Sequence, residues 1–187
     1  RPKVEAYSDH IFAVVRAVRT ETDVLFSAHQ VALFIGNGFV ISVRDERYGQ
    51  FEPVRDRLRV SRGRIRYRGA DYLGYALIDS IVDHYLPVVD HVTERIEALA
   101  DDLLGPSTES LVAQVQSARR ALGRLRRLSM PLKDVVEQLQ REPAVISDET
   151  RLFLRDCADN ALTILDSVEQ LCEMATHVMD AHMALVN

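Results

Sequence analysis

Acidic side chains at helical spacing are the residues of this sequence best suited to chemistry, and hard cations are what they would bind. A first acidic helical stretch carries Asp71, Asp79, Asp83, Asp90, Glu94, Glu97, Asp101 and Asp102. A second carries Asp156, Asp159, Asp166, Glu169, Glu173 and Asp180. Mg²⁺ prefers oxygen ligands and keeps several of its waters, so one or two carboxylates per site suffice. From the charge pattern alone, solvated helix faces remain the default interpretation.

Histidines offer a second candidate metal site. His84 and His91 are seven residues apart, hence on one helix face, and each follows an aspartate. Such a pair suits a softer metal such as zinc, although solvation of a helix face explains it more simply.

Catalytic chemistry has little support in the sequence. The chain contains no Gly-x-Ser-x-Gly, no phosphate-binding glycine loop and no His-Glu-x-x-His. We therefore predict that it is not an enzyme.

A run of arginines is the one feature that suggests a phosphate-rich partner. It comprises Arg55, Arg57, Arg59, Arg62, Arg64, Arg66 and Arg68. Apart from Tyr67, no aromatic residue is interleaved with the run to stack on bases, and no nucleic-acid-binding motif accompanies it. We predict a solvated face, or pairing with the acidic helices, and no nucleic acid as partner.

Composition indicates a folded globular chain. Of 187 residues, 47% are hydrophobic and 27% charged, and the net charge is −5, with residues 1–70 basic and residues 71–187 acidic. Two cysteines, Cys157 and Cys172, do not form a disulfide framework. No apolar run reaches about 18 residues, so these residues are not expected to span a membrane. The abrupt ends of the sequence suggest that both are cuts in a longer protein.

The first third of the chain has the pattern of a β-sheet. Apolar, β-branched segments predict strands over 10–19, 29–36 and 38–44. Gly36-Asn37-Gly38 predicts a tight hairpin between the last two, because Asn and Gly tolerate positive φ. Residues 51–60 predict a short helix with Pro53 in its first turn.

From Ala70 onward the hydrophobic period becomes helical. We predict helices over 70–104, about 108–141 and 148 to the end, with a break at 105–107. Pro87 and Pro131 should kink the first and second helices. In the third helix, steps of four and three predict a packing seam made of Ala161, Leu165, Val168, Cys172, Ala175 and Met179.

These elements define an α+β fold, in which a partial β-sheet with short helices precedes three long antiparallel helices. Two parts are expected. Residues 1–69 form the C-terminal part of an α/β domain, and residues 70–187 form a long-helix region.

Several stretches resemble the CorA family of Mg²⁺/Co²⁺ channels. They are the opening RPKVEAYSDHIFAVVRAV, the hairpin VALFIGNGFVISVRDE, the block FEPVRDRLRVSRGRIRYRGADYLGYALIDSIVDHYLPVVDHVTERIEALADDLL, the segment MPLKDVV around Pro131, and LFLRDCADNALTILDSVEQL. The likeness covers essentially the whole chain.

The resemblance implies the cytoplasmic, Mg²⁺-sensing regulatory domain of a channel that transports magnesium and cobalt. It implies a homopentamer at the cytoplasmic face of the inner membrane, attached through membrane helices that would follow Asn187, while the fragment itself is soluble. Asp79 and Asp156 match sensing carboxylates of the family, with Mg²⁺ as the bound ion, Co²⁺ as a second candidate and Zn²⁺ as a less favoured third. The remaining ligands would come from a segment upstream of residue 1.

Two alternatives stay open. A ZntB-like zinc transporter shares the architecture, and the His84–His91 pair keeps that hypothesis in view. A helical adaptor without a transport role is the other alternative. The residues that follow Asn187 in the gene would decide between transporter and adaptor.

Overall fold

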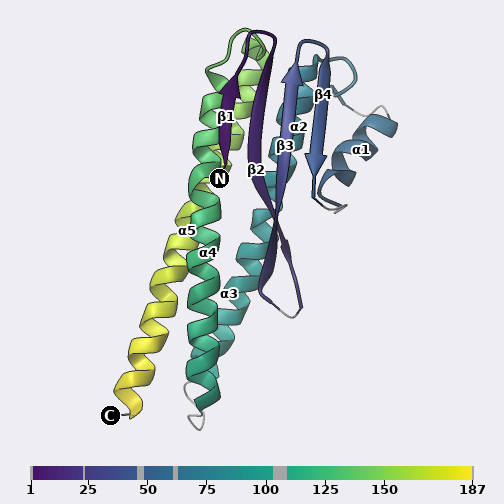
Figure 1. Ribbon diagram of the computed structural model, residues 1–187. Coiled ribbons are helices and arrows are strands. Elements are labelled where there is room, and N and C mark those ends of the chain that lie inside the picture. The colour runs from purple at the N-terminus through teal and green to yellow at the C-terminus, as the bar shows by residue number, and fades with distance from the viewer. Residues whose placement is uncertain (1, 23, 46–48, 61–62, 103–108, 187) are drawn as a thin grey trace.

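The computed structural model describes residues 2–22, 24–45, 49–60, 63–102 and 109–186. Its elements in chain order are β1 (Lys3–Ala6), β2 (His10–Thr20), β3 (Phe26–Gly36), β4 (Phe39–Arg44), a 3₁₀ turn η1 (Gly49–Phe51), α1 (Glu52–Arg59), α2 (Ala70–Asp83), α3 (Tyr85–Asp102), α4 (Glu109–Gln140) and α5 (Asp148–Val186). The predicted α+β class is confirmed. The sheet lies toward one end of the molecule (Figure 1). Helices α2 and α3 lead away from that end, α4 runs back toward it, and α5 leads away from it again.

The four strands form one antiparallel sheet in which each strand pairs with its neighbours in the chain. On β2, Ile11 and Val15 are buried, and their partners across the pairing with β3 are Ile35 and Val31, which are buried too. Side chains at alternate positions share one face of a sheet, so this face supplies the core. The three predicted strands are confirmed, and β1 is an addition that the sequence pattern did not reveal.

Two glycines allow close geometry around the sheet. Gly38 has φ of 94°, which favours glycine and confirms the predicted hairpin between β3 and β4. Gly74 of α2 lies against the sheet, since a Cβ placed there would come within 2.6 Å of the Ile35 side chain. Helix α2 therefore packs directly on β3 through a position without a side chain.

The first long helix is interrupted, as Pro87 predicts. It divides into α2 and α3, with a turn residue, His84, between them. Proline at position 87 has no N–H to offer the carbonyl of Asp83, so the helical ladder is weakened at that point. Pro131 has no such effect on the continuity of α4, which runs unbroken through it.

The hairpin of α4 and α5 is the longest packed unit (Figure 1). The predicted start of its first helix and the predicted break at 105–107 fall partly or wholly outside the described residues, and α4 is described from Glu109. From Cys157 onward, one stripe of buried residues on α5 recurs in steps of four and three: Cys157, Ala161, Ile164, Val168, Leu171, Ala175, Val178 and His182.

The predicted seam of α5 is wrong by one residue at three of its six positions. Leu165, Cys172 and Met179 are only partly buried, and the residues immediately before them are buried instead. Both stripes are apolar and both repeat every seven residues, so spacing alone does not choose between them. Because α5 packs against α2 and α3 as well as α4, the flanking stripe is half covered.

None of the helices in the described part of the chain is both long enough and apolar enough for a membrane span. Sheet and helices share one connected apolar core. The division of the chain at residues 69 and 70 stays a prediction.

Candidate functional site

Asp79 lies half-buried in the second turn from the end of α2, on the side that meets α5. The Tyr75 hydroxyl, one turn earlier, donates to its Oδ2 over 3.1 Å. The thiol of Cys157 on α5 is a second hydrogen-bond partner. Asp79 is thus held between two helices by two neutral donors.

The electrostatic environment of Asp79 opposes its negative charge. Burial raises the pKa of the carboxyl, and the neighbouring charge of Asp83 raises it further. The hydrogen bonds from Tyr75 and Cys157 and the positive charge of Arg57 lower the pKa but do not compensate. A nearby cation stabilises the charged form of a carboxylate that is desolvated and lies next to a second carboxylate.

Tyr75 and Cys157 respond to the same environment. Burial and the charge of Asp79 raise the pKa of the Tyr75 hydroxyl, and they raise the pKa of the Cys157 thiol as well. Both groups therefore stay protonated at neutral pH. In that state they donate to Asp79 and add no charge of their own.

Asp156 precedes Cys157 on α5, and its side chain is exposed. Cys157 is completely buried and faces α2, so the helix directs Asp156 toward solvent. The two predicted metal ligands are therefore near each other along the α2–α5 contact, but they point to different environments. Within the described residues, no group of three or more His, Cys, Asp or Glu is arranged to hold a metal ion.

This arrangement can supply isolated carboxylate oxygens to a cation whose other ligands come from water or from another chain. Mg²⁺ accepts such a site, because it binds through one or two carboxylates and keeps several waters. A site for Zn²⁺, with three or four closely placed protein ligands, has a different form. The chemistry of the donors thus fits a hard cation bound at a surface.

Asp71, in the first turn of α2, is a carboxylate whose role the sequence did not reveal. It is buried, and its Oδ2 accepts hydrogen bonds from the backbone N–H of Ser147 at 3.0 Å and from the Ser147 hydroxyl at 2.6 Å. The same hydroxyl accepts from the N–H of Thr150 and so caps the start of α5. Asp71 ties the first turn of α2 to the beginning of α5.

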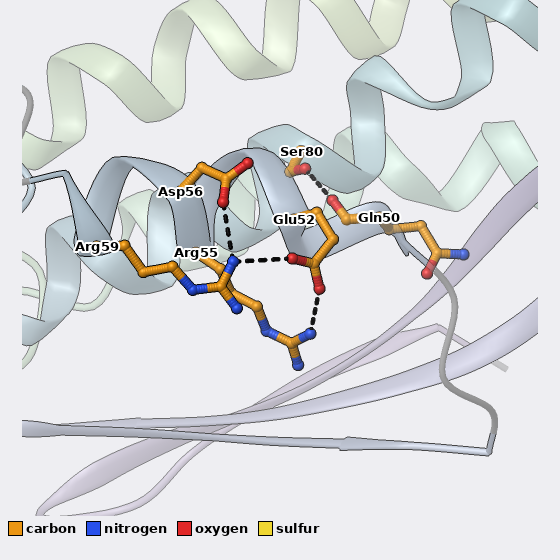
Figure 2. A network of polar contacts seen from close by, with 6 residues as sticks. All are labelled: Gln50, Glu52, Arg55, Asp56, Arg59 and Ser80. Carbon is orange, nitrogen blue, oxygen red and sulfur yellow. Dashed lines mark hydrogen bonds and ion pairs between the residues drawn. The ribbon is translucent and has the colours of Figure 1, made fainter.

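The basic run of α1 is satisfied locally. Glu52 pairs with Arg55 at 2.5 Å, and Arg59 bridges Glu52 and Asp56, which Figure 2 shows beside the contact from Ser80 to the Gln50 carbonyl. These exposed pairs lie within one helix and are screened by solvent, so each contributes little to stability.

Pairing of the same run with the acidic long helices, the other predicted outcome, is seen for Arg68. Its guanidinium contacts Glu149 at the start of α5 and lies 5.6 Å from the ring centroids of Tyr72 and Phe153. Arg62, a further member of the run, lies outside the described residues. Within the described part of the run, the arginines that have partners stabilise the fold through contacts inside the chain.

The two histidines considered for a softer metal have separate surroundings. His84 Nδ1 bonds to the Ser80 carbonyl one turn earlier, at the junction of α2 and α3. His91 lines an open cavity beside α4 together with Arg95. Neither belongs to a described metal-binding group.

Comparison with known proteins gives a consistent result. The family model described as "CorA-like Mg2+ transporter protein" matches residues 1–187. The cobalt/magnesium transport protein CorA of Thermotoga maritima is 31% identical over 189 residues, covering 100% of this chain and 54% of that protein. A putative metal ion transporter of Bacillus subtilis, YfjQ, is 26% identical over 99% of this chain and 57% of its own length.

Solved structures share the fold. The soluble domain of CorA from Methanocaldococcus jannaschii superposes with a TM-score of 0.84 at 20% identity, covering 98% of this chain and 74% of that one. The ZntB cytoplasmic domain from Vibrio parahaemolyticus gives 0.83 at 16% identity, covering 98% of this chain and 72% of that one. The chain spans about half the length of the curated relatives it matches.

Proposed function

The chain belongs to the CorA-like Mg²⁺ transporter family, and on that premise we propose that it is the cytoplasmic, cation-sensing part of a divalent-cation channel. The longer protein would transport Mg²⁺, with Co²⁺ as a further substrate, and would assemble as a homopentamer in the inner membrane. Membrane helices that follow α5 would anchor it. The observation that carries the sensing proposal is the destabilised Asp79 carboxylate at the contact of α2 with α5.

The fold offers a path from a sensor to a membrane. Helix α5 has 39 residues, hence a length of about 58 Å. The start of α5 lies beside Asp71 near the sheet, and its residue Cys157 contacts Asp79. The helix then continues to the far end of the molecule (Figure 1). A rigid helix that touches the sensor at one end can transmit a tilt to whatever continues from the other.

The mechanism follows from charge. Without a cation, the carboxylates of Asp79 and Asp83 repel each other, and exposed Asp156 would repel any acidic surface of a neighbouring subunit. Mg²⁺ bound between subunits would reverse that repulsion and favour one closed arrangement. When Mg²⁺ falls below roughly millimolar levels the sites would empty and the closed state would lose that advantage.

Asp156→Asn in the full-length protein tests this proposal. The variant should retain Mg²⁺ influx into proteoliposomes and lose part of the inhibition by Mg²⁺ on the cytoplasmic side, because one exposed ligand is removed. Influx is measured with an encapsulated Mg²⁺ indicator, and Asp101→Asn on α3 is the matched exposed control. Unchanged inhibition in Asp156→Asn would remove this residue from the sensor.

Zinc transport is the second candidate, since the fold resembles the ZntB cytoplasmic domain as closely as that of CorA. The identity with the cobalt/magnesium protein favours the first candidate. Family membership also favours transport over the adaptor hypothesis. The same liposomes with a Zn²⁺ indicator separate the two transport candidates.

A further inference from the structure

An open cavity beside α4 has the charge and size of a ligand site and contains neither Asp79 nor Asp156. It lies between the end of the β2–β3 hairpin, α3 and α4, and its volume of about 560 Å³ is within the range typical of small-molecule sites. The lining residues on which its chemistry depends are Thr22, Leu25, Arg95, Ser117, Arg120 and Arg124.

Three guanidinium groups line this cavity from two helices. Arg95 comes from α3, and Arg120 and Arg124 are one turn apart on the same face of α4. Arg95 donates to Gln114, and Arg124 lies 5.1 Å from the ring centroid of Phe26. Among the described residues, none of the three arginines forms an ion pair with a carboxylate.

The one carboxylate among the described lining residues does not neutralise them. Glu21 pairs instead with Arg19 at 2.7 Å and accepts a hydrogen bond from the Ser27 hydroxyl at 2.8 Å. This contrasts with α1, where Arg55 and Arg59 have carboxylate partners within their own helix. Among the described lining residues, positive charge therefore exceeds negative charge.

The remaining lining defines what kind of anion fits. Guanidinium groups bind phosphate oxygens in pairs of hydrogen bonds, and three of them match more than one phosphate group. Leu25, Ala118 and Ala121 give the cavity an apolar wall, and Ser117 adds a hydroxyl. The wall offers contact to an organic moiety that inorganic phosphate lacks.

We propose that this cavity binds a small organic phosphate with two or more phosphate groups, of the class of nucleoside di- and triphosphates. The proposal is independent of cation sensing, because the cavity shares no residue with Asp79, Asp83 or Asp156. Because Mg²⁺ binds to such phosphates, a site of this kind in a divalent-cation transporter would make the domain responsive to ligands of the transported ion.

Calorimetric titration of the 187-residue chain with ADP tests the proposal, in EDTA so that no cation site contributes. We expect saturable 1:1 binding, at least tenfold weaker in the double variant Arg120→Gln/Arg124→Gln. Ser117→Glu, at an exposed position of the lining, should weaken binding similarly while leaving the arginines in place. Arg127→Gln is the matched control, because Arg127 is exposed on α4 but does not line the cavity.

The controls also define what would overturn the proposal. Absence of binding at 5 mM ADP would do so directly. Equal weakening by Arg127→Gln and by the double variant would show general attraction to the basic surface of α4. Pyrophosphate binding as tight as ADP, or adenosine binding as tight as ADP, would exclude an organic phosphate as the ligand class. Circular dichroism of each variant checks that the helices are retained.

Discussion

The two ends of α2 carry two carboxylates with opposite environments. Asp71, in the first turn, and Asp79, eight residues later, both lie against α5. Burial acts to raise the pKa of Asp71, but the hydrogen bonds from the hydroxyl and N–H of Ser147 outweigh it and hold the pKa below its usual range. Burial also raises the pKa of Asp79, and there the charge of Asp83 adds to the rise.

The difference separates a carboxylate whose charge is compensated within the fold from one whose charge is not. Asp71 has donors from the protein itself, including a backbone N–H and a capping hydroxyl, so its charge is already compensated. Asp79 has two neutral donors, and the charge of Arg57 does not offset its burial and its acidic neighbour, so its charge is not fully compensated. An added cation would therefore stabilise the second site and have little effect at the first.

The largest effect is expected for Asp71→Ala. The change leaves the buried N–H and hydroxyl of Ser147 without their acceptor and loosens the start of α5, which should cost about 2 kcal/mol of unfolding free energy. For a chain of this size Tm should fall by roughly 4–8 °C. Thermal unfolding followed by circular dichroism measures it. Asp101→Ala, at an exposed position of α3, should change Tm by less than about 2 °C, and equal losses in both variants would contradict the anchoring role.

A smaller effect of opposite sign is expected for Asp79→Asn. Asparagine keeps an acceptor for Tyr75 and removes the buried charge, so Tm at pH 7 without metal should rise by roughly 1–3 °C. Because the folded-state pKa of Asp79 is raised, the stability linked to its protonation is present below the ordinary pKa of 3.8 and is lost as pH rises through the folded-state value.

The gain in Asp79→Asn should therefore vanish as the pH is lowered toward 3.8. Asp71 should behave in the reverse way. Its lowered pKa contributes stability above the ordinary value, and this stability is lost as pH falls through the folded-state pKa. Thermal unfolding of both variants between pH 3.5 and 7 compares the two profiles. A Tm gain for Asp79→Asn that persists unchanged at the acidic end would refute the charge-based explanation.

Local patterns predicted much of the fold because several elements are specified by their own residues. Alternation and the Gly36–Gly38 turn specify β2 to β4, and Pro87 specifies the interruption after α2. β1 was not predicted, since Lys3–Ala6 is short and exposed at both ends and becomes a strand by pairing with β2. The seam of α5 was displaced because Ile164 and Leu165 are equally apolar, and the surrounding helices decide which one is buried.

The candidate site was less predictable than the fold. Asp79 and Asp156 came from a resemblance to a family, while acidic spacing alone did not distinguish them from their neighbours. The environment of Asp79 depends on Cys157, which is distant in sequence, and the partner of Asp71 is 76 positions away. Contacts of this kind arise from tertiary packing and have no local signal.

The central proposal is that Asp79 senses Mg²⁺ and Asp71 does not. The most direct measurement is the Mg²⁺ concentration that gives half-maximal protection of the full-length protein from limited proteolysis, in the wild type and in Asp79→Asn, with Asp101→Asn as control. The account predicts at least a fivefold higher concentration for Asp79→Asn and an unchanged value for the control. The same concentration in Asp79→Asn as in the wild type would contradict it.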